Sequence, residues 1–527
     1  MNKLRFIIAV TLLAGLGACS KSDFAESYPD PSKINTSTVE KQFAGFLVTN
    51  REYVLPSYWN YFVVLRTSVN RYTQSVGWVN SNSQYVPGAA SINDRWNNFY
   101  NLLSQYRNFE LIYDKLSDAD KTAYRIFKIA ATIYLYDHTQ RVVDLHGDIP
   151  FTNAGNLSGN GGDYGKSLPS YDQAPAIYTK MLDDLKGFAT ELNSLTVPAG
   201  ILTGFKNQDF INNGDLSLWK AYCNSLRLRM LSRVSGVAAF TGRSTSESAE
   251  ILGNPAQFPI VSANNRNIQI DVYNLSTPLN SSGFRSGLED WDGNLAGKVM
   301  IDHLKANADP RLRAIFEPGV NAAGNYTGLD PMLTASAQTE LVATGTLSIY
   351  NRSTLSRNQF FPGILMNAAE VSLIAAEYNL KNNNTAAAKT AYETAIRQSI
   401  EFYFGVRSLS NDNTSGALSP VTETEITDYL AKPAISWDAA ATTADKLKLI
   451  AYQKWIHFNV VQPLDNWAEM RRLDGIPLSF EVDNSNVQKQ PPYRWVYAGS
   501  ELIYNAENYE AVRAADNLTT KIFWDQN

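Results

Sequence analysis

Apolar side chains recur at three- and four-residue spacing along much of this chain, a pattern typical of helices that bury one face. The longest example covers residues 123–145, and Ser117 with Asp120 forms a capping-box pattern ahead of it. We expect this helix to run for about 25 residues. Strands should be few and short, with residues 268–272 as a candidate. Further helices are predicted over 38–50, 57–70, 92–115, 172–194, 217–235, 367–381, 385–403 and 443–460.

Two of these predicted helices, 367–381 and 385–403, are dense in alanine and are joined by three asparagines. Small side chains let two helices approach closely, so this segment indicates an antiparallel helix pair of the size found in tetratricopeptide stacks. The repeat consensus itself is not met. The sequence therefore predicts a mainly α fold with tetratricopeptide-like helix pairs, long loops and few short strands.

Three long segments, 73–91, 150–170 and 253–297, interrupt the helical pattern and are rich in Asn, Ser, Gly and aromatic residues. Loops of this length inside a compact protein are usually functional or disordered. Their aromatic content favours a functional role. With 527 residues, 44% of them hydrophobic, the chain as a whole is expected to fold around a large core.

The N-terminus has the features of an export signal. A short basic start and an apolar run over residues 6–16 are followed by the order Leu-Gly-Ala-Cys, which ends at Cys19. The apolar run is shorter than the ~20 residues that a membrane-spanning helix needs. The ending resembles the lipobox of bacterial lipoproteins, in which the cysteine is acylated. We predict a lipoprotein signal peptide over 1–18, lipidation of Cys19, a flexible tether over 19–37 and a single domain over 38–527.

Composition favours binding over chemistry. The net charge of −5 argues against a nucleic-acid partner, because such binding needs a basic surface. The chain has only four His and two Cys, against 10 Trp, 28 Tyr and 23 Phe. Acylation of Cys19 would leave Cys223 alone, and its place on a helical apolar stripe predicts a buried core residue.

The histidines give no sign of a metal site. His138 and His146 are eight residues apart, which matches no zinc-binding spacing, so both are expected to be structural. We predict no metal and no other cofactor.

An acidic stretch around Trp291 is the best candidate for catalysis. Glu289, Asp290 and Asp292 could suggest the carboxylate pair of a glycosidase, but neighbours on a loop are no evidence for the required ~5–10 Å separation. As a calcium loop the stretch lacks the required glycine, which is replaced by Leu295. We therefore predict no catalytic residue and no enzymatic activity.

Several short motifs stand out along the chain. They are Gly147-Asp148-Ile149-Pro150-Phe151, Asp309-Pro310-Arg311-Leu312, Phe361-Pro362-Gly363-Ile364-Leu365-Met366, Ala369-Glu370, Ala376-Glu377 and Asn466-Trp467-Ala468-Glu469-Met470-Arg471-Arg472. Their order resembles the SusD/RagB family, the surface lipoproteins of Bacteroidetes that bind nutrients for TonB-dependent transporters. The resemblance runs nearly from end to end, although Met470 stands where the family usually has a tryptophan.

The resemblance implies a SusD-like α-helical fold and a surface-exposed protein, anchored by lipid to the outer membrane. It also implies a SusC-like TonB-dependent transporter as the partner. The expected function is to bind oligosaccharide and deliver it to that transporter. One alternative is the capture of peptides or protein fragments, as in RagB, and another is a helical glycoside hydrolase.

Some prominent side chains are expected to be structural. Trp467, Arg471 and Arg472 lie at helical spacing near Glu469, where they could form either a ligand site or a buried ion-pair lock between helices. We favour the lock, because buried arginine is normally paired. Trp96 is expected in the core.

A glycan site needs aromatic planes for the C–H faces of sugars and polar groups at their edges for the hydroxyls. Two of the long loops, about 73–91 and 253–297, supply that mixture and would form a ligand-binding lobe. The predicted ligand-binding residues are Trp78, Asn80 and Tyr85 in the first loop and Tyr273, Phe284, Arg285, Trp291 and Asp292 in the second.

Overall fold

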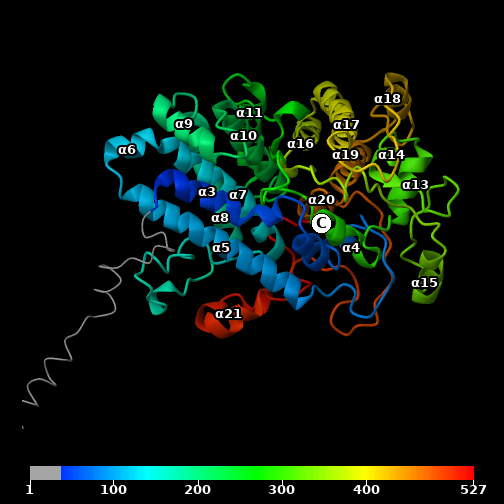
Figure 1. The fold of residues 1–527 in the computed structure, drawn as a ribbon, viewed down its shortest axis with the longest axis horizontal. Helices are drawn as coiled ribbons and strands as arrows, with labels where there is room; N and C mark the ends of the chain where they lie inside the picture. The colour runs from blue at the N-terminus through cyan, green and yellow to red at the C-terminus, as the bar shows by residue number, and fades with distance from the viewer. Residues whose placement is uncertain (1–36) are drawn as a thin grey trace, which may run out of the picture.

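A computed structural model describes residues 37–527, and helices dominate it (Figure 1). The predicted mainly α class is confirmed. The predicted signal peptide, Cys19 and the tether up to residue 36 lie outside the described residues.

Each predicted helix has a counterpart. The α-helices are α3 (Val39–Thr49), α4 (Val69–Tyr72), α5 (Ala89–Asp114), α6 (Asp118–Ala123), α7 (Arg125–His146), α8 (Ala174–Glu191), α9 (Ala199–Gln208), α10 (Leu216–Arg233), α11 (Thr241–Gly253), α12 (Phe284–Glu289), α13 (Lys298–Ala306), α14 (Leu312–Ile315), α15 (Ala335–Ala343), α16 (Ala368–Lys381), α17 (Thr385–Ser408), α18 (Glu423–Leu430), α19 (Thr443–Phe458), α20 (Pro463–Leu473), α21 (Gly499–Tyr504) and α22 (Ala506–Tyr509). A π-helix, η3 (Trp59–Leu65), and short 3-10 turns, η2 (Arg51–Tyr53), η4 (Gly165–Ser167), η5 (Asn264–Arg266), η6 (Asp290–Asp292) and η7 (Arg513–Ala515), complete the set.

Two predicted helices differ from the observed ones. The long helix is broken at Tyr124 into α6 and α7, and the Ser117 cap, which accepts a hydrogen bond from the Asp120 backbone N–H, begins the short α6. The helix expected over 57–70 is divided between η3 and α4. Short helices such as α13 and α15 were not predicted. Each has only nine residues, too few for a helical repeat of apolar side chains to be recognised.

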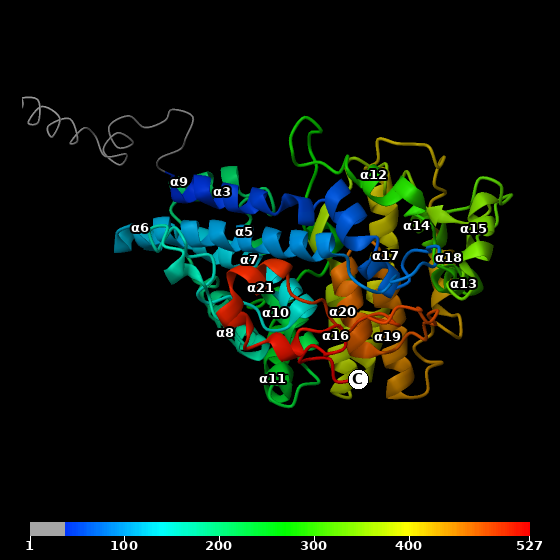
Figure 2. The same cartoon turned by 90° about the horizontal axis from the view of Figure 1, so that it is seen from below.

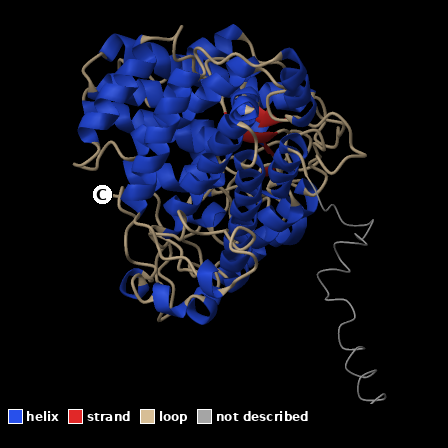
Figure 3. Cartoon of the chain, turned by 90° about the vertical axis from the view of Figure 1, so that its left-hand side faces the viewer, coloured by secondary structure: helices blue, strands red, loops and turns tan. Residues whose placement is uncertain are grey.

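Two pairs of short antiparallel strands are small beside the helices (Figure 3). β1 (Ile268–Ile270) pairs with β4 (Gly363–Met366), and β2 (Phe316–Glu317) pairs with β3 (Ile349–Tyr350). The prediction of few strands, with one starting at Ile268, is confirmed. β1 and β4 tie the second predicted loop to the start of the alanine-rich helix pair.

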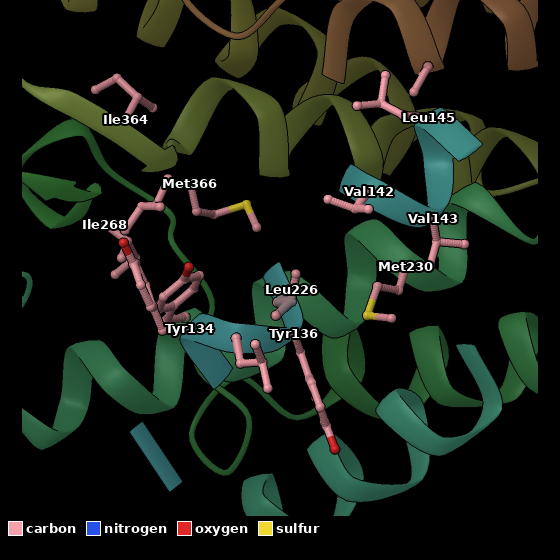
Figure 4. Packing of buried hydrophobic residues seen from close by; sticks show 14 of the residues in the cluster. Tyr134, Tyr136, Val142, Val143, Leu145, Leu226, Met230, Ile268, Ile364 and Met366 are labelled. Carbon is pink, nitrogen blue, oxygen red and sulfur yellow. The ribbon is translucent and has the colours of Figure 1, made fainter. Parts of the chain in front are cut away.

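The helices pack in layers. α3, α5 and α7 lie side by side (Figure 2), and α16 packs along α17 as the predicted antiparallel pair. Between these groups, fully buried side chains of α7, α10, β1 and β4 share one apolar cluster (Figure 4): Tyr134, Leu226, Met230, Ile268 and Met366. Trp96 and Cys223 are also buried, as predicted, and burial raises the pKa of the Cys223 thiol to about 12.

The predicted ion-pair lock is present in α20. Arg472 donates to Glu377 of α16 at 2.6 Å and to Glu469 of its own helix at 2.6 Å, and all three side chains are buried. Lys454 of α19 joins both carboxylates. The guanidinium of Arg471 instead lies 3.8 Å from the ring of Trp467. These side chains hold three helices together and are not available to a ligand.

Three of the four histidines, His138, His146 and His457, are buried in packed surroundings. His457 hydrogen-bonds through both ring nitrogens, to Ser399 and Asn367, and burial lowers its pKa to about 3. His146 bonds to the Val496 carbonyl. Neither ring nitrogen of His138 has a hydrogen-bond partner within residues 37–527. The same range contains no group of three or more His, Cys, Asp or Glu side chains arranged to hold a metal ion.

Candidate ligand-binding site

The structure brings Trp78, Trp291 and Asp292 to one cleft of about 240 Å³. Backbone pairing joins the two loops there, because the Gly77 N–H donates to the Leu295 carbonyl at 2.8 Å. We call this the aromatic cleft, and its main lining side chains are Arg66, Arg71, Trp78, Trp291, Asp292 and Val342.

Trp291 is the most prominent side chain of the aromatic cleft. It is 83% exposed, and both Trp291 and Asp292 have left-handed backbone, with φ of 56° and 55°. This conformation costs on the order of 1–3 kcal/mol in a residue other than glycine and is concentrated at functional sites. An apolar ring held in water on a strained turn is suited to contact with a ligand.

A column of side chains along the π-helix and at its two ends supports Trp291. Tyr58 stacks on Phe62 at 5.1 Å between ring centroids, and the Arg66 guanidinium lies 4.1 Å from the centre of the Phe62 ring. Trp291 meets Phe62 edge to face at 6.4 Å. Tyr58 and its neighbour Trp59 are 39% and 46% exposed. The aromatic surface therefore extends beyond the predicted loops, onto a segment that sequence reasoning treated only as a helix.

Glycines let α12 approach the π-helix. A Cβ atom on Gly287 would lie 2.9 Å from the Ser57 carbonyl oxygen and 2.9 Å from Tyr61 Cβ. A Cβ on Gly293 would lie 2.8 Å from Arg66 Cδ. These close approaches set the position of the turn that carries Trp291.

Replacing Gly287 by alanine is expected to lower the free energy of unfolding by about 1–3 kcal/mol, because α12 must move away from the π-helix. Denaturant unfolding measures this effect. The matched control is Gly187→Ala in α8, where no atom lies within 4 Å of the new Cβ. That change should stabilise the protein by up to about 1 kcal/mol, since the residue is exposed in a helix interior. Equal effects of the two changes would contradict the packing argument.

Trp78 forms a wall of the aromatic cleft with little of its ring exposed. Its Nε1 donates to Gln84 Oε1 at 2.7 Å, and only 7% of the residue is exposed. The Arg71 guanidinium lies 5.9 Å from its ring centre. Trp78 thus combines contact with the aromatic cleft and a structural role in its loop.

Two other residues of the first loop lie outside the aromatic cleft. Asn80 is buried, and its Nδ2 donates to the Pro331 carbonyl at 2.8 Å. Tyr85 is fully buried and donates to the Glu481 carbonyl at 2.8 Å. Asn80 thereby holds the first loop against the segment before α15, and Tyr85 holds it against the segment that follows α20 (Figure 1). Asn80 also borders a separate polar cleft of about 150 Å³, whereas Tyr85 offers no surface to a ligand.

Three residues of the second loop are likewise not brought to the aromatic cleft. Phe284 is fully buried between Tyr61 and Phe361, so its proposed ligand contact is replaced by a role in the core. Tyr273 is 70% exposed, but its hydroxyl accepts a hydrogen bond from Asn213 and does not line the aromatic cleft. Arg285 is exposed and 3.9 Å from Glu289.

Neighbouring side chains hold the carboxylate of Glu289, which is close to Trp291 in the chain. Burial opposes ionisation of Glu289, but hydrogen bonds from Arg357 and Ser356 outweigh it and keep the pKa of Glu289 below its usual value. A glycosidase acid requires the opposite shift. Glu289 is therefore not suited to act as the acid of a glycosidase. Asp290 and Asp292 are exposed, and their carboxylates make no hydrogen bond within residues 37–527.

A SusD-like family model, described as "Starch-binding associating with outer membrane", matches residues 35–498. Several solved structures are similar in fold. A chitin-binding protein has 22% identity and a TM-score of 0.72, covering 92% of this chain and 100% of its own. A SusD homolog from Bacteroides fragilis has 19% identity and a TM-score of 0.73, with 93% and 100% covered. A chitin-binding SusD homolog from Flavobacterium johnsoniae has 21% identity and a TM-score of 0.70, with 92% and 99% covered. No curated protein matches the sequence.

Proposed function

The chain belongs to the SusD-like family, and from this premise we propose that it is a cell-surface receptor that binds oligosaccharide without hydrolysing it. The observation that carries the proposal is the exposed Trp291 ring on its strained turn, with Arg66, Arg71 and Asp292 around it. Sugars stack their C–H faces on such rings, and the charged groups can bond the hydroxyls. Two structures of similar fold that are described as chitin-binding support a glycan as the ligand class.

The proposed place of the protein is the outer membrane, with the folded chain from residue 38 acting as one domain. Acylated Cys19 would be the anchor and residues 20–37 the tether, and a SusC-like TonB-dependent transporter would receive the bound glycan. The family description supports association with the outer membrane. Within residues 37–527, no helix is long and apolar enough to span a membrane.

Titration calorimetry of the purified protein tests the proposal against oligosaccharides of starch, chitin, xylan and pectin and against a mixture of peptides. We expect binding to at least one saccharide and no release of reducing ends during incubation. Binding of peptides alone would favour a RagB-like receptor. Released reducing ends that disappear in Asp290→Asn or Asp292→Asn variants would identify a hydrolase instead.

A further inference from the structure

Two arginines of the aromatic cleft have no protein partner for their charge. Arg66 follows the π-helix and Arg71 lies in α4. Within the described part of the chain, neither guanidinium makes a hydrogen bond or an ion pair, and the Nε atom of each is shielded from solvent without a partner. Arg229 and Arg311, buried in the core, are both paired with carboxylates.

These two unpaired charges are also close enough to affect each other. Burial and then the charge of Arg66 lower the pKa of Arg71 to about 10. Burial lowers the pKa of Arg66 as well, with Tyr58 and Asp290 opposing it. Neither Asp290 nor Asp292, the exposed carboxylates at this turn, is within 4.0 Å of a guanidinium nitrogen of either arginine. Partly buried positive charges without a counter-ion destabilise a protein unless a ligand supplies one.

The aromatic rings hold the guanidinium groups in place. Arg66 lies 4.1 Å from the centre of Phe62 and 5.9 Å from that of Trp291, while Arg71 lies 5.9 Å from Trp78. The attraction of a cation to an aromatic ring uses none of the guanidinium N–H groups as hydrogen-bond donors to a polar atom. A guanidinium edge is a forked donor that matches the two oxygens of a carboxylate or a sulfate.

We propose that the aromatic cleft recognises a saccharide unit that carries an anionic group, either a carboxylate or a sulfate ester. Arg66 and Arg71 bind the anion, and Trp291 contacts the face of the sugar ring. This specificity rests on the proposed glycan-binding function. Because the whole chain carries a net charge of −5, long-range attraction does not explain such recognition, and the two arginines must provide it locally.

The test compares matched ligands on the unmodified protein by titration calorimetry. The probes are oligogalacturonate, the same oligosaccharide with methyl-esterified carboxylates, a chondroitin sulfate oligosaccharide, and neutral starch and chitin oligosaccharides. We expect an anionic probe to bind at least about 10-fold more tightly than the neutral ones, since a hydrogen bond to a charged group is worth ~1.5–3 kcal/mol. The uronate and sulfate arms identify which anion is preferred.

Variants locate the effect. The double variant Arg66→Gln with Arg71→Gln should lose the preference for the anionic probe, whereas Arg397→Gln, at an exposed ion pair on α17, should keep it. Equal affinity of the unmodified protein for charged and esterified probes would overturn the inference but leave glycan binding intact. Retention of the preference by the double variant would also overturn it. Absence of binding to every saccharide would overturn both this inference and the proposed function.

Discussion

Replacing Arg472 by methionine is expected to lower the free energy of unfolding by about 3–5 kcal/mol. The change leaves Glu377 and Glu469 buried, with the ammonium of Lys454 shared between them. Lys381 remains as a further partner of Glu377, and Arg233 as a further partner of Glu469. Removing one member of a buried ion network leaves the remaining charges buried and incompletely paired. This destabilises the protein by more than the intact interaction stabilised it. The loss should appear in denaturant unfolding as a lower midpoint with an unchanged slope.

The matched control is Arg397→Met. Arg397 pairs with Glu423 at 2.7 Å, but the side chains are 38% and 69% exposed, so its loss should cost less than about 1 kcal/mol. Similar losses in the two variants would contradict a special role for the buried network.

The effect of Arg472→Met should also depend on pH. Burial favours the neutral form of Glu377 and Glu469, but the charges of Arg472 and Lys454 outweigh it and hold both pKa values well below the usual 4.5. Lys381 adds to this effect at Glu377. Carboxylates with lowered folded pKa values stabilise the protein fully above the unfolded pKa, and this contribution is lost as the pH falls toward the folded pKa. The difference in the free energy of unfolding between the unmodified protein and Arg472→Met should therefore become smaller below about pH 4.5. A constant gap from neutral to acidic pH would contradict this account.

The spacing of apolar residues in the sequence predicted a helix well where apolar side chains recur on one face over many turns. α5 and α8 follow such patterns, with their buried residues on one face. The break at Tyr124 and the π-helix η3 are not visible in the pattern. Residues within α20 indicated the ion-pair lock. Its partner Glu377 lies 95 positions from Arg472 in the chain, so spacing alone could not identify it.

The candidate site was predicted only in part. Composition identified the loops that carry Trp78, Trp291 and Asp292, and the structure joins them at one cleft. The same reasoning included Tyr85 and Phe284, which are buried, because composition does not say which way an aromatic side chain faces on an irregular segment. It missed the column of Tyr58, Phe62 and Arg66, which depends on the geometry of the π-helix, and it missed Arg71 of α4. The spacing of four residues between Tyr58, Phe62 and Arg66 is the one signal that could have indicated the column.

Replacing Trp291 by alanine is expected to weaken glycan binding by at least about 30-fold, the effect of losing an aromatic side chain worth ~2 kcal/mol or more at the centre of a binding site. Because the ring is 83% exposed, the free energy of unfolding should change by less than about 0.5 kcal/mol. Calorimetric titration with the saccharide that binds the unmodified protein measures the affinity, and denaturant unfolding measures the free energy of unfolding.

Two companion variants separate ligand contact from structural support. Tyr504→Ala removes a ring that is 74% exposed on α21, outside the aromatic cleft, and should change neither glycan affinity nor the free energy of unfolding. Trp78→Ala should reduce both glycan affinity and the free energy of unfolding, because the ring is 7% exposed and its Nε1 is bonded to Gln84. If Trp291→Ala leaves affinity within about twofold of the unmodified protein, a difference of only ~0.4 kcal/mol, the ligand does not bind at the aromatic cleft. If Trp291→Ala lowers stability as much as Trp78→Ala does, the strained turn serves the fold and its exposure is not evidence of binding.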